Sequence, residues 1–300
     1  MVEQRTENPC VGGSIPPQAT NSHASRVTTI QQKRAAFRSL HSEGCFVLPN
    51  PWDVGSARML EGLGFKALAT TSSGHAWSMG LPDGAESRDA TLEYMRSIVA
   101  ATQLPVNADF EDGYAPDPRG VAEAVRMAID TGVAGLSIED STGDPANPIR
   151  TIEDGIARLR AARAAIDESG ADVMLIGRAE NFLHGRPDLR DTLQRLRAYA
   201  EAGADCLYAP GIGTREQIVA IVHAVAPRPV NLLIGSATEF SLQDVAALGV
   251  RRVSVGGALA RAAWAGFLGA ARSIADEGRF PFADVTPGGE LNTFFRKFVG

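Results

Sequence analysis

From Thr28 onward, eight short apolar runs alternate with longer amphipathic stretches, and this rhythm constrains the fold more than any other feature. The runs are nearly continuous in apolar residues, as is typical of parallel strands buried on both faces of a sheet. The stretches between them repeat apolar residues at helical spacing. The expected strands are Cys45–Leu48, Ala67–Thr70, Val106–Asp109, Gly135–Glu139, Val173–Gly177, Cys206–Ala209, Val230–Ile234 and Arg252–Val255.

The helical stretches complete the pattern of βα units. Residues Ile152–Glu168 and Leu189–Ala202 each place apolar side chains on one face at intervals of three or four. Eight strands and eight helices in about 250 residues predict an α/β fold of the (β/α)8 TIM-barrel type. An open doubly wound sheet is the alternative, but it normally carries a glycine-rich phosphate loop after its first strand. Here the first strand is followed by Pro49-Asn-Pro-Trp-Asp53 instead.

Glycines that follow the helical stretches mark their expected ends. Glycine supplies the left-handed turn that terminates a helix at low cost. The glycines at this position, each followed by a new strand, are Gly64, Gly132, Gly170, Gly203 and Gly249.

Composition and charge narrow the class of protein. Of the residues, 44% are hydrophobic and 21% charged, and the net charge of −6 gives no reason to expect nucleic acid or an anionic membrane as partner. No apolar run approaches the roughly 18–20 residues that span a bilayer, and the first residues lack the pattern of a signal peptide. A cytoplasmic enzyme is therefore expected. We expect residues 1–26, which are polar, to be a disordered N-terminal tail, and residues 27–300 to form a single barrel-type catalytic domain.

The three cysteines indicate a reducing compartment and no disulfide framework. They are few, odd in number and without a Cys-x-x-Cys spacing. Each could act as a nucleophile. Cys45 and Cys206 lie in apolar strand-like runs, however, where cysteine usually packs as a small hydrophobic residue, and Cys10 lies in the polar tail.

Chemistry is expected where the strands end, because active sites of TIM barrels lie at the C-terminal ends of their strands. Asp109 and Glu139 each end an apolar strand, where an acid is costly unless it is compensated. Arg178 follows a strand in the same way and can hold a carboxylate in a bidentate fork. The other residues expected near this rim include Trp52, Asp53, Thr71, Ser72, Ser73, Gly74, Asp83, Glu111, Asp112, Asp140, Glu180, Asn181 and Tyr208.

Carboxylates that converge on one rim predict a cation between them. Like charges in a partly buried site repel and raise one another's pKa, and a hard divalent cation relieves this. Oxygen ligands suit Mg²⁺, or Mn²⁺ in its place. Hydroxyls and backbone N–H groups of residues 72–74 can bind the anionic end of a substrate.

Several of these polar residues also have ordinary structural interpretations. We expect Asp53 to cap the helix that starts at Val54. Asp112 and Asp117 are interpreted as solvated loop acids, and Asp140 as a turn or cap residue. His75 and His184 lie in rim loops and, with Glu180 and Tyr208, are the candidates for the proton donor, among which the sequence does not choose.

Six motifs, in this order along residues 28–275, resemble those of the isocitrate lyase/phosphoenolpyruvate mutase superfamily. Any one of them is weak, whereas together they are specific. They are Asn50-Pro-Trp-Asp-Val-Gly-Ser-Ala-Arg58, Thr70-Thr-Ser-Ser-Gly74, Gly80-Leu-Pro-Asp-Gly84, Asp109-Phe-Glu-Asp-Gly-Tyr114, Ser137-Ile-Glu-Asp140 and Gly177-Arg-Ala-Glu180.

This resemblance implies a barrel whose last helix is exchanged between subunits of a homodimer or homotetramer. It also implies Mg²⁺ and an enolate-type intermediate of a small anionic 2-oxo acid or phosphonate. By position, Asp109 resembles the direct metal ligand, and Arg178 resembles the group that reaches the substrate opposite. The acids that would hold the water shell of the metal are Asp83, Glu111 and Glu139, and the substrate carboxylate site would be Ser73 and Gly74.

The chain departs from the pattern of the superfamily at two points. The second acid of the Asp-x-Asp motif is Glu111, one methylene longer, and Ala115 replaces the final glycine. Residues 141–148 read Ser-Thr-Gly-Asp-Pro-Ala-Asn-Pro and lack the Cys, Lys and His of the isocitrate lyase loop. Ser141 also replaces the lysine of the phosphoenolpyruvate mutase loop. Both subgroup reactions are therefore disfavoured.

The resulting hypothesis is an Mg²⁺-dependent lyase that cleaves a C–C bond next to the 2-oxo group of an oxaloacetate-like or malate-like acid, with residues 141–150 as a lid. Alternatives are P–C chemistry on a phosphonate and a non-catalytic barrel that binds 2-oxo acids. The expected catalytic residues are Arg178, Glu180 and Glu111. The expected substrate-binding residues are Trp52, Ser73, Gly74, His75, Asn181 and Tyr208, and the expected metal ligands are Asp83, Asp109, Glu111 and Glu139.

Overall fold

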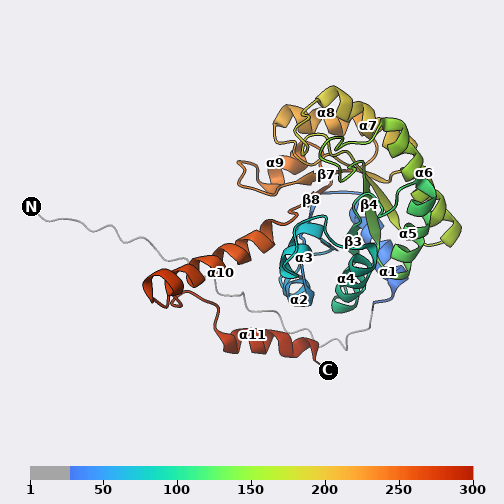
Figure 1. Ribbon diagram of the computed structural model, residues 1–300. Coiled ribbons are helices and arrows are strands. Elements are labelled where there is room, and N and C mark those ends of the chain that lie inside the picture. The colour runs from blue at the N-terminus through green and yellow to red at the C-terminus, as the bar shows by residue number, and fades with distance from the viewer. Residues whose placement is uncertain (1–27, 300) are drawn as a thin grey trace, which may run out of the picture.

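The computed structural model describes residues 28–299 and confirms the (β/α)8 barrel (Figure 1). Eight parallel strands form one sheet in the order β1-β8-β7-β6-β5-β4-β3-β2, so the chain winds once around the barrel. The two edge strands of the sheet, β1 and β2, are brought together by a hydrogen bond of 3.0 Å from the Ala69 N–H to the carbonyl of Pro49. The expected N-terminal tail and Cys10 lie outside the described residues.

Each expected apolar run contains a strand, at bounds close to those predicted. The fifth strand differs in that it extends one residue further and ends with Arg178, whose backbone pairs with Glu139 of the fourth. The strands are β1 Phe46–Leu48, β2 Leu68–Ala69, β3 Val106–Asp109, β4 Gly135–Glu139, β5 Met174–Arg178, β6 Cys206–Tyr208, β7 Val230–Leu233 and β8 Arg252–Ser254.

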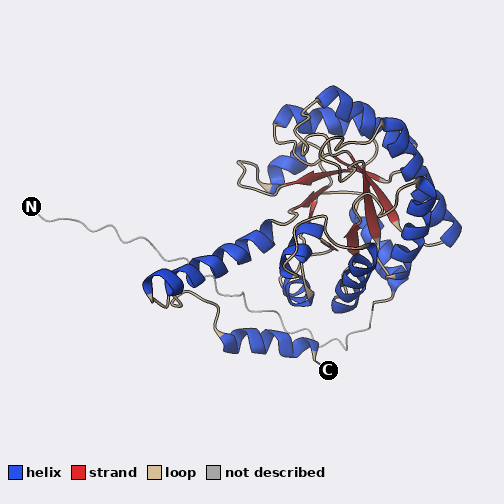
Figure 2. Cartoon of the chain, in the orientation of Figure 1, coloured by secondary structure: helices blue, strands red, loops and turns tan. Residues whose placement is uncertain are grey.

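Helices cover the outside of the sheet, as Figure 2 shows. All five glycines expected to end helices have positive φ, and Gly170 is the left-handed C-cap of α6. The helices are α1 Ile30–Leu40, α2 Val54–Gly62, α3 Ser72–Ser78, α4 Arg88–Ala101, α5 Pro118–Asp130, α6 Ile152–Ser169, α7 Leu189–Glu201, α8 Arg215–Val225, α9 Leu242–Ala247, α10 Ala258–Glu277 and α11 Gly288–Phe295, followed by the 3-10 turn η1 Arg296–Phe298.

Capping residues explain where several helices near the rim begin. Asp53 accepts a hydrogen bond from the backbone of Ser56 and caps α2, as expected. Asp117 is exposed, as expected, and it also caps α5, where Pro118 occupies the first helical position. These acids therefore fix the loops from which the rim is built.

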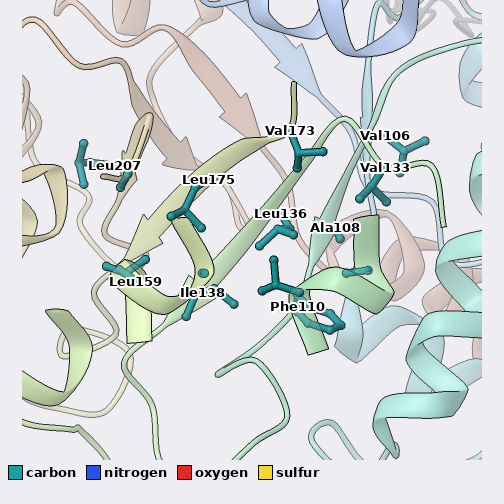
Figure 3. Close-up of a cluster of buried hydrophobic side chains, with 14 of the residues drawn as sticks. Val106, Ala108, Phe110, Val133, Leu136, Ile138, Leu159, Val173, Leu175 and Leu207 are labelled. Carbon is teal, nitrogen blue, oxygen red and sulfur yellow. The ribbon is translucent and has the colours of Figure 1, made fainter. Parts of the chain in front are cut away.

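Strand residues alternate between two apolar layers. Val106, Leu136 and Leu175 point outward into the core between sheet and helices, which Figure 3 shows in part. A second, smaller cluster fills the lower barrel interior around Phe37 of α1 and Met174. Because side chains alternate along a strand, the intervening residues point into the barrel and reach its mouth at the C-terminal ends.

Helix α10 projects away from the barrel (Figure 1). Of its side chains only Ala260 is buried, while Trp264 and Phe267 are exposed, the latter at 61%. Its large apolar side chains are therefore mostly exposed in the single chain. The chain then returns, and Phe294 of α11 packs against Gly62 of α2.

Close packing of α6 against α7 generates a stability prediction. A Cβ at Gly155 would lie 2.6 Å from the hydroxyl oxygen of Tyr199, a buried side chain. Gly155→Ala should therefore lower the free energy of unfolding by about 1–3 kcal/mol, as measured by urea denaturation. Gly289→Ala in the first turn of α11 meets nothing within 4 Å and is the matched control, with a change within about 0.5 kcal/mol. Equal effects of the two substitutions would contradict this packing argument.

Candidate active site

Arg178 is the centre of the charged cluster at the mouth of the barrel. Its Nη1 lies 3.0 Å from Asp109 Oδ1 and 3.1 Å from Glu139 Oε2, and its Nε donates to Glu180. Burial alone would lower the pKa of Arg178, but the attraction of Glu139, Glu180 and Asp109 outweighs it and raises this pKa well above its usual range. The guanidinium therefore remains charged and ties the ends of β3, β4 and β5 together.

Asp109 is held by the loop after β2 as well as by Arg178. Its Oδ2 accepts hydrogen bonds from the backbone N–H and the hydroxyl of Ser72, at 3.3 and 3.2 Å. Its own N–H donates to the hydroxyl of Thr70 at 2.8 Å. This carboxylate is consequently fixed in position while 19% of its side chain remains exposed.

Two adjoining cavities open at this cluster. The first has a volume of about 180 Å³ and is lined by Asp109, Ser73, Tyr208 and Arg252, among others. The second, of about 450 Å³, is bounded by residues 141–143 and by most of the acids. Its lining residues are Ser72, Asp83, Gly84, Glu111, Asp112, Glu139, Ser141, Thr142, Gly143, Arg178, Glu180, Leu183 and His184. The predicted metal ligands therefore line two adjoining cavities, because Asp83 and Arg178 are part of the wall of both.

Glu111 is held in an unusual conformation. Its φ of 44° lies in the left-handed region, which is costly for a residue with a side chain. Its carboxyl accepts a hydrogen bond of 2.8 Å from the hydroxyl of Tyr114, which in turn accepts one from Thr91. Burial, together with the charges of Asp109 and Asp83, raises the pKa of Glu111 to about 7, although the Tyr114 bond opposes this.

Burial and neighbouring charges also raise the pKa of two other acids. Burial raises the pKa of Glu139, and the nearby Glu180 and Asp109 add to the effect against the attraction of Arg178. The pKa of Asp83 is raised by desolvation of its carboxyl and by the charge of Asp109, although its loop is exposed. Several carboxylates thus share one arginine, and a further cation would stabilise them.

These acids fit a hydrated divalent cation. Within residues 28–299, no three His, Cys, Asp or Glu side chains come close enough to enclose a metal ion directly. Mg²⁺, however, binds through one or two carboxylates and keeps several of its waters. Asp109 provides such a carboxylate, and Asp83, Glu111 and Glu139 surround the space where waters would lie.

A buried network behind the rim corrects the interpretation of Asp140. It is not a turn or cap residue: it is 2% exposed and accepts hydrogen bonds from Tyr199, Arg195 and the backbone N–H of Glu180. Asp112 likewise is not a solvated loop acid, since it lies 2.8 Å from Arg150 in a half-buried ion pair. Both acids position the loops that carry the site.

Four predicted substrate-binding residues lie beside the cavities without lining them. His75 stacks on Tyr94 and its Nδ1 lies 2.8 Å from both carboxyl oxygens of Glu86. Asn181 donates to Thr192 inside the wall of the barrel. The remaining two, Trp52 and Gly74, pack against each other, and Trp52 also faces α10.

Sequence reasoning missed polar residues that line the smaller cavity from inside the barrel. Asn107, Asn231 and Arg252 lie on strands whose neighbouring residues are apolar and point outward. Asn50 also lines this cavity, and its Oδ1 accepts hydrogen bonds from the N–H groups of Val255 and Gly256. Amides and an arginine at inward positions of apolar strands were the available signal.

The two cysteines within residues 28–299 carry no reactive signature. Cys206 is buried in the lower interior, and burial raises the pKa of its thiol. Burial also raises the pKa of Cys45. Both thiols therefore remain protonated near neutral pH and pack as small hydrophobic groups.

Comparisons with known proteins agree with this geometry. Residues 37–275 match the family model of phosphoenolpyruvate phosphomutase. An oxaloacetate decarboxylase of Paraburkholderia xenovorans is 31% identical over 246 residues, which cover 78% of each chain.

Two solved structures are similar throughout the fold. One is a protein of Burkholderia cenocepacia provisionally described as a lyase or mutase, with a TM-score of 0.87 and 48% identity over 89% of this chain and 97% of that one. The other is an oxaloacetate acetylhydrolase in complex with its product oxalate, with a TM-score of 0.80 and 26% identity over 89% of this chain and 94% of that one. Since the family model spans most of the barrel and these relatives are lyases and mutases, the chain belongs to the isocitrate lyase/phosphoenolpyruvate mutase superfamily of enzymes.

Proposed function

We propose that this enzyme is an Mg²⁺-dependent lyase that cleaves a C–C bond adjacent to the 2-oxo group of a small dicarboxylic acid of the oxaloacetate or malate type. The observation that carries the proposal is the strand-end carboxylate of Asp109, fixed by Ser72 and Arg178 at a cavity lined by further acids. Arrays of this kind bind a hard cation together with an anionic oxygen ligand.

The cation and Arg178 have complementary roles in this proposal. When bound beside Asp109, Mg²⁺ supplies the positive charge that stabilises an enolate oxygen. Arg178 is buried and already fixed by three carboxylates, so it can stabilise developing negative charge without reorganising. Ser73, which lines the same cavity, can donate its hydroxyl to the substrate carboxylate.

Three of the four candidate proton donors line the cavities. Glu180 and His184 line the larger cavity and Tyr208 the smaller one, whereas His75 is engaged with Glu86. Burial raises the pKa of Tyr208 to about 12. Its hydroxyl is therefore protonated at neutral pH and suited to donate a proton to a developing carbanion.

In this proposal the segment 141–150 acts as a lid over the site. An antiparallel bridge joins Ser141 to Ile149, and the Ser141 hydroxyl donates to Glu139 at 2.5 Å. Arg150 anchors its end to Asp112. The first residues of the segment, Ser141, Thr142 and Gly143, line the larger cavity, and its far end is joined to the loop that follows β3. This position supports a role in excluding water.

The similarity to an oxaloacetate decarboxylase and to an oxaloacetate acetylhydrolase supports C–C cleavage over P–C chemistry. The matching family model carries the name of a phosphomutase, so phosphonates are the second substrate class to test. The exposed apolar face of α10, which includes Trp264 and Phe267, supports assembly into a homodimer or homotetramer through exchange of this helix. No helix among residues 28–299 is long and apolar enough to cross a membrane.

Oxalate, a mimic of enolpyruvate, tests the site directly. We expect calorimetry to show oxalate binding that requires Mg²⁺, and Asp109→Ala to weaken it by more than about 100-fold, because loss of outer partners of a metal alone costs 10- to 100-fold. Asp130→Ala, at the exposed end of α5, is the matched control and should bind as the wild type does. Binding without Mg²⁺, or binding that survives Asp109→Ala, would refute the metal–enolate site.

The raised pKa of Glu111 predicts a pH dependence of stability in the metal-free protein. Because the pKa of Glu111 is raised to about 7 in the fold, the folded state binds more protons than the unfolded state between its ordinary pKa and about 7. The contribution of Glu111 to stability is therefore present at low pH and is lost as the pH rises through about 7. Thermal unfolding across this range should show the loss in the wild type.

Glu111→Gln removes the titrating group while retaining its shape, so the fall in melting temperature should be shallower in this variant than in the wild type. Saturating Mg²⁺ should reverse the trend in the wild type, because the cation binds only the ionised carboxylates. Identical pH profiles for wild type and variant would show that Glu111 does not titrate in this range.

A further inference from the structure

Arg252 lies inside the barrel at the start of β8 and is only 2% exposed. Its Nε donates to Asn231 Oδ1 at 2.8 Å. Its Nη1 lies 3.4 Å from Asn107 Oδ1 and 3.4 Å from His41 Nε2. Its Nη2 forms no hydrogen bond with any residue in the range 28–299, although the side chain lines the smaller cavity.

None of the contacts of Arg252 within the described chain carries a negative charge. Burial, reinforced by Arg252, lowers the pKa of His41 to about 3, so this histidine is neutral. Burial raises the pKa of Cys206 and that of Tyr208, so these groups are neutral as well. The other neighbours are amides and the ring of Phe37, whose centroid lies 6.0 Å from the guanidinium carbon. No carboxylate of the described residues forms an ion pair with this guanidinium.

Such a charge is costly to bury. An arginine cannot lose its proton in a protein, and an uncompensated buried charge strongly destabilises the fold. Arg178, at the rim, shows the usual solution, with three carboxylates around one guanidinium. Arg252 is instead oriented by Asn231 and Asn107, which accept hydrogen bonds without neutralising the charge.

Strand register connects the two arginines. Arg178 pairs with Tyr208, Tyr208 with Asn231, and Asn231 with Arg252, so these residues form one row across β5 to β8. Their side chains all line the smaller cavity. Interiors of such barrels are normally filled by branched apolar side chains, and this polar row is therefore a departure that packing does not explain.

We infer that Arg252 binds the distal carboxylate of a dianionic 2-oxo acid whose 2-oxo end lies at Asp109 and Arg178. This inference rests on the proposed function and specifies its substrate class. The distal carboxylate accepts hydrogen bonds from Nη2 and supplies the negative charge that the protein does not provide. Asn231 and Asn107 act as positioning residues that hold the guanidinium toward the cavity.

This arrangement selects between substrates of similar size. A monoanionic 2-oxo acid satisfies the rim and leaves Arg252 uncompensated, whereas a dicarboxylic acid satisfies both ends. An analogue that leaves a buried charged group of the site unpaired is rejected strongly. An analogue that only makes fewer apolar contacts is rejected weakly. Arg252 is thus a specificity-determining residue for dicarboxylic over monocarboxylic 2-oxo acids.

The test compares two stable ligands by calorimetry in the presence of Mg²⁺. 3,3-Difluorooxaloacetate carries the distal carboxylate, and 2-oxobutanoate carries a methyl group in its place. Arg252→Met, which retains much of the side-chain volume, should weaken binding of the first ligand by about 10- to 100-fold, as expected for loss of a charge-assisted hydrogen bond. Binding of 2-oxobutanoate should change by less than about twofold. Arg252→Lys retains the charge but not the fork and should fall between.

A second variant keeps the test decisive if Arg252→Met does not fold. Asn231→Asp places a carboxylate beside Arg252 Nε, which lies 2.8 Å from the amide oxygen of Asn231 in the wild type. The amide nitrogen of Asn231 donates to the hydroxyl of Ser254. The new carboxylate supplies an internal counter-ion. The melting temperature should therefore rise, while binding of 3,3-difluorooxaloacetate should weaken by about tenfold or more, since the new carboxylate competes with the ligand.

The outcomes separate this inference from the proposed function. If the wild type binds both ligands and Arg252→Met or Asn231→Asp weakens them equally or not at all, the distal site is refuted while the 2-oxo-acid site stands. If the wild type binds neither ligand, both fall. Titrations in chloride-free buffer and with added chloride test whether Arg252 binds an inorganic anion instead. If chloride stabilises the wild type but not Arg252→Met, and the ligand affinities do not change, Arg252 is an inorganic anion site and the inference is overturned.

Discussion

The ion pairs of Arg178 are the interaction on which the candidate site depends. One guanidinium meets Asp109 from β3, Glu139 from β4 and Glu180 from the loop after β5. Without it, three carboxylates would repel one another in a partly buried space, and the ends of three strands would separate. With it they remain together, yet burial, and after it the neighbouring carboxylates, still raise the pKa of Glu139 and of Glu111. These buried, crowded acids are the physical basis for the cation that we propose at the rim.

The charges in the barrel are arranged by depth. Acids exceed cations at the mouth, whereas Arg252, deeper in the interior, has no acid beside it. A ligand that brings a metal ion to the rim and a carboxylate to the interior would neutralise both ends at once. Two amide side chains and a neutral histidine provide polar contacts to Nε and Nη1 of Arg252.

A second layer of ion pairs holds the loops that carry these groups. Asp140 joins the backbone of Glu180 to Arg195 and Tyr199, and Arg150 joins the base of the lid segment to Asp112. Asp140 lines neither cavity, and Asp112 lines only the larger one. Their burial ensures that Glu180 and the lid segment keep fixed positions relative to Arg178, since functional groups need a rigid supporting shell.

The sequence by itself determined the barrel and the rim acids. Strand after strand could be predicted because fully buried parallel strands must be apolar, and Asp109, Glu139 and Arg178 were recognisable as charged residues at the ends of such strands. Only the tertiary structure decided which polar residues face the cavity. His75 turned toward Glu86 and Asp140 became a buried anchor, while Asn231 and Arg252 came to line the interior. The reason is that a sequence pattern reports whether a position is buried, whereas the partner of a buried polar group is set by strand register and helix packing between residues far apart in the chain.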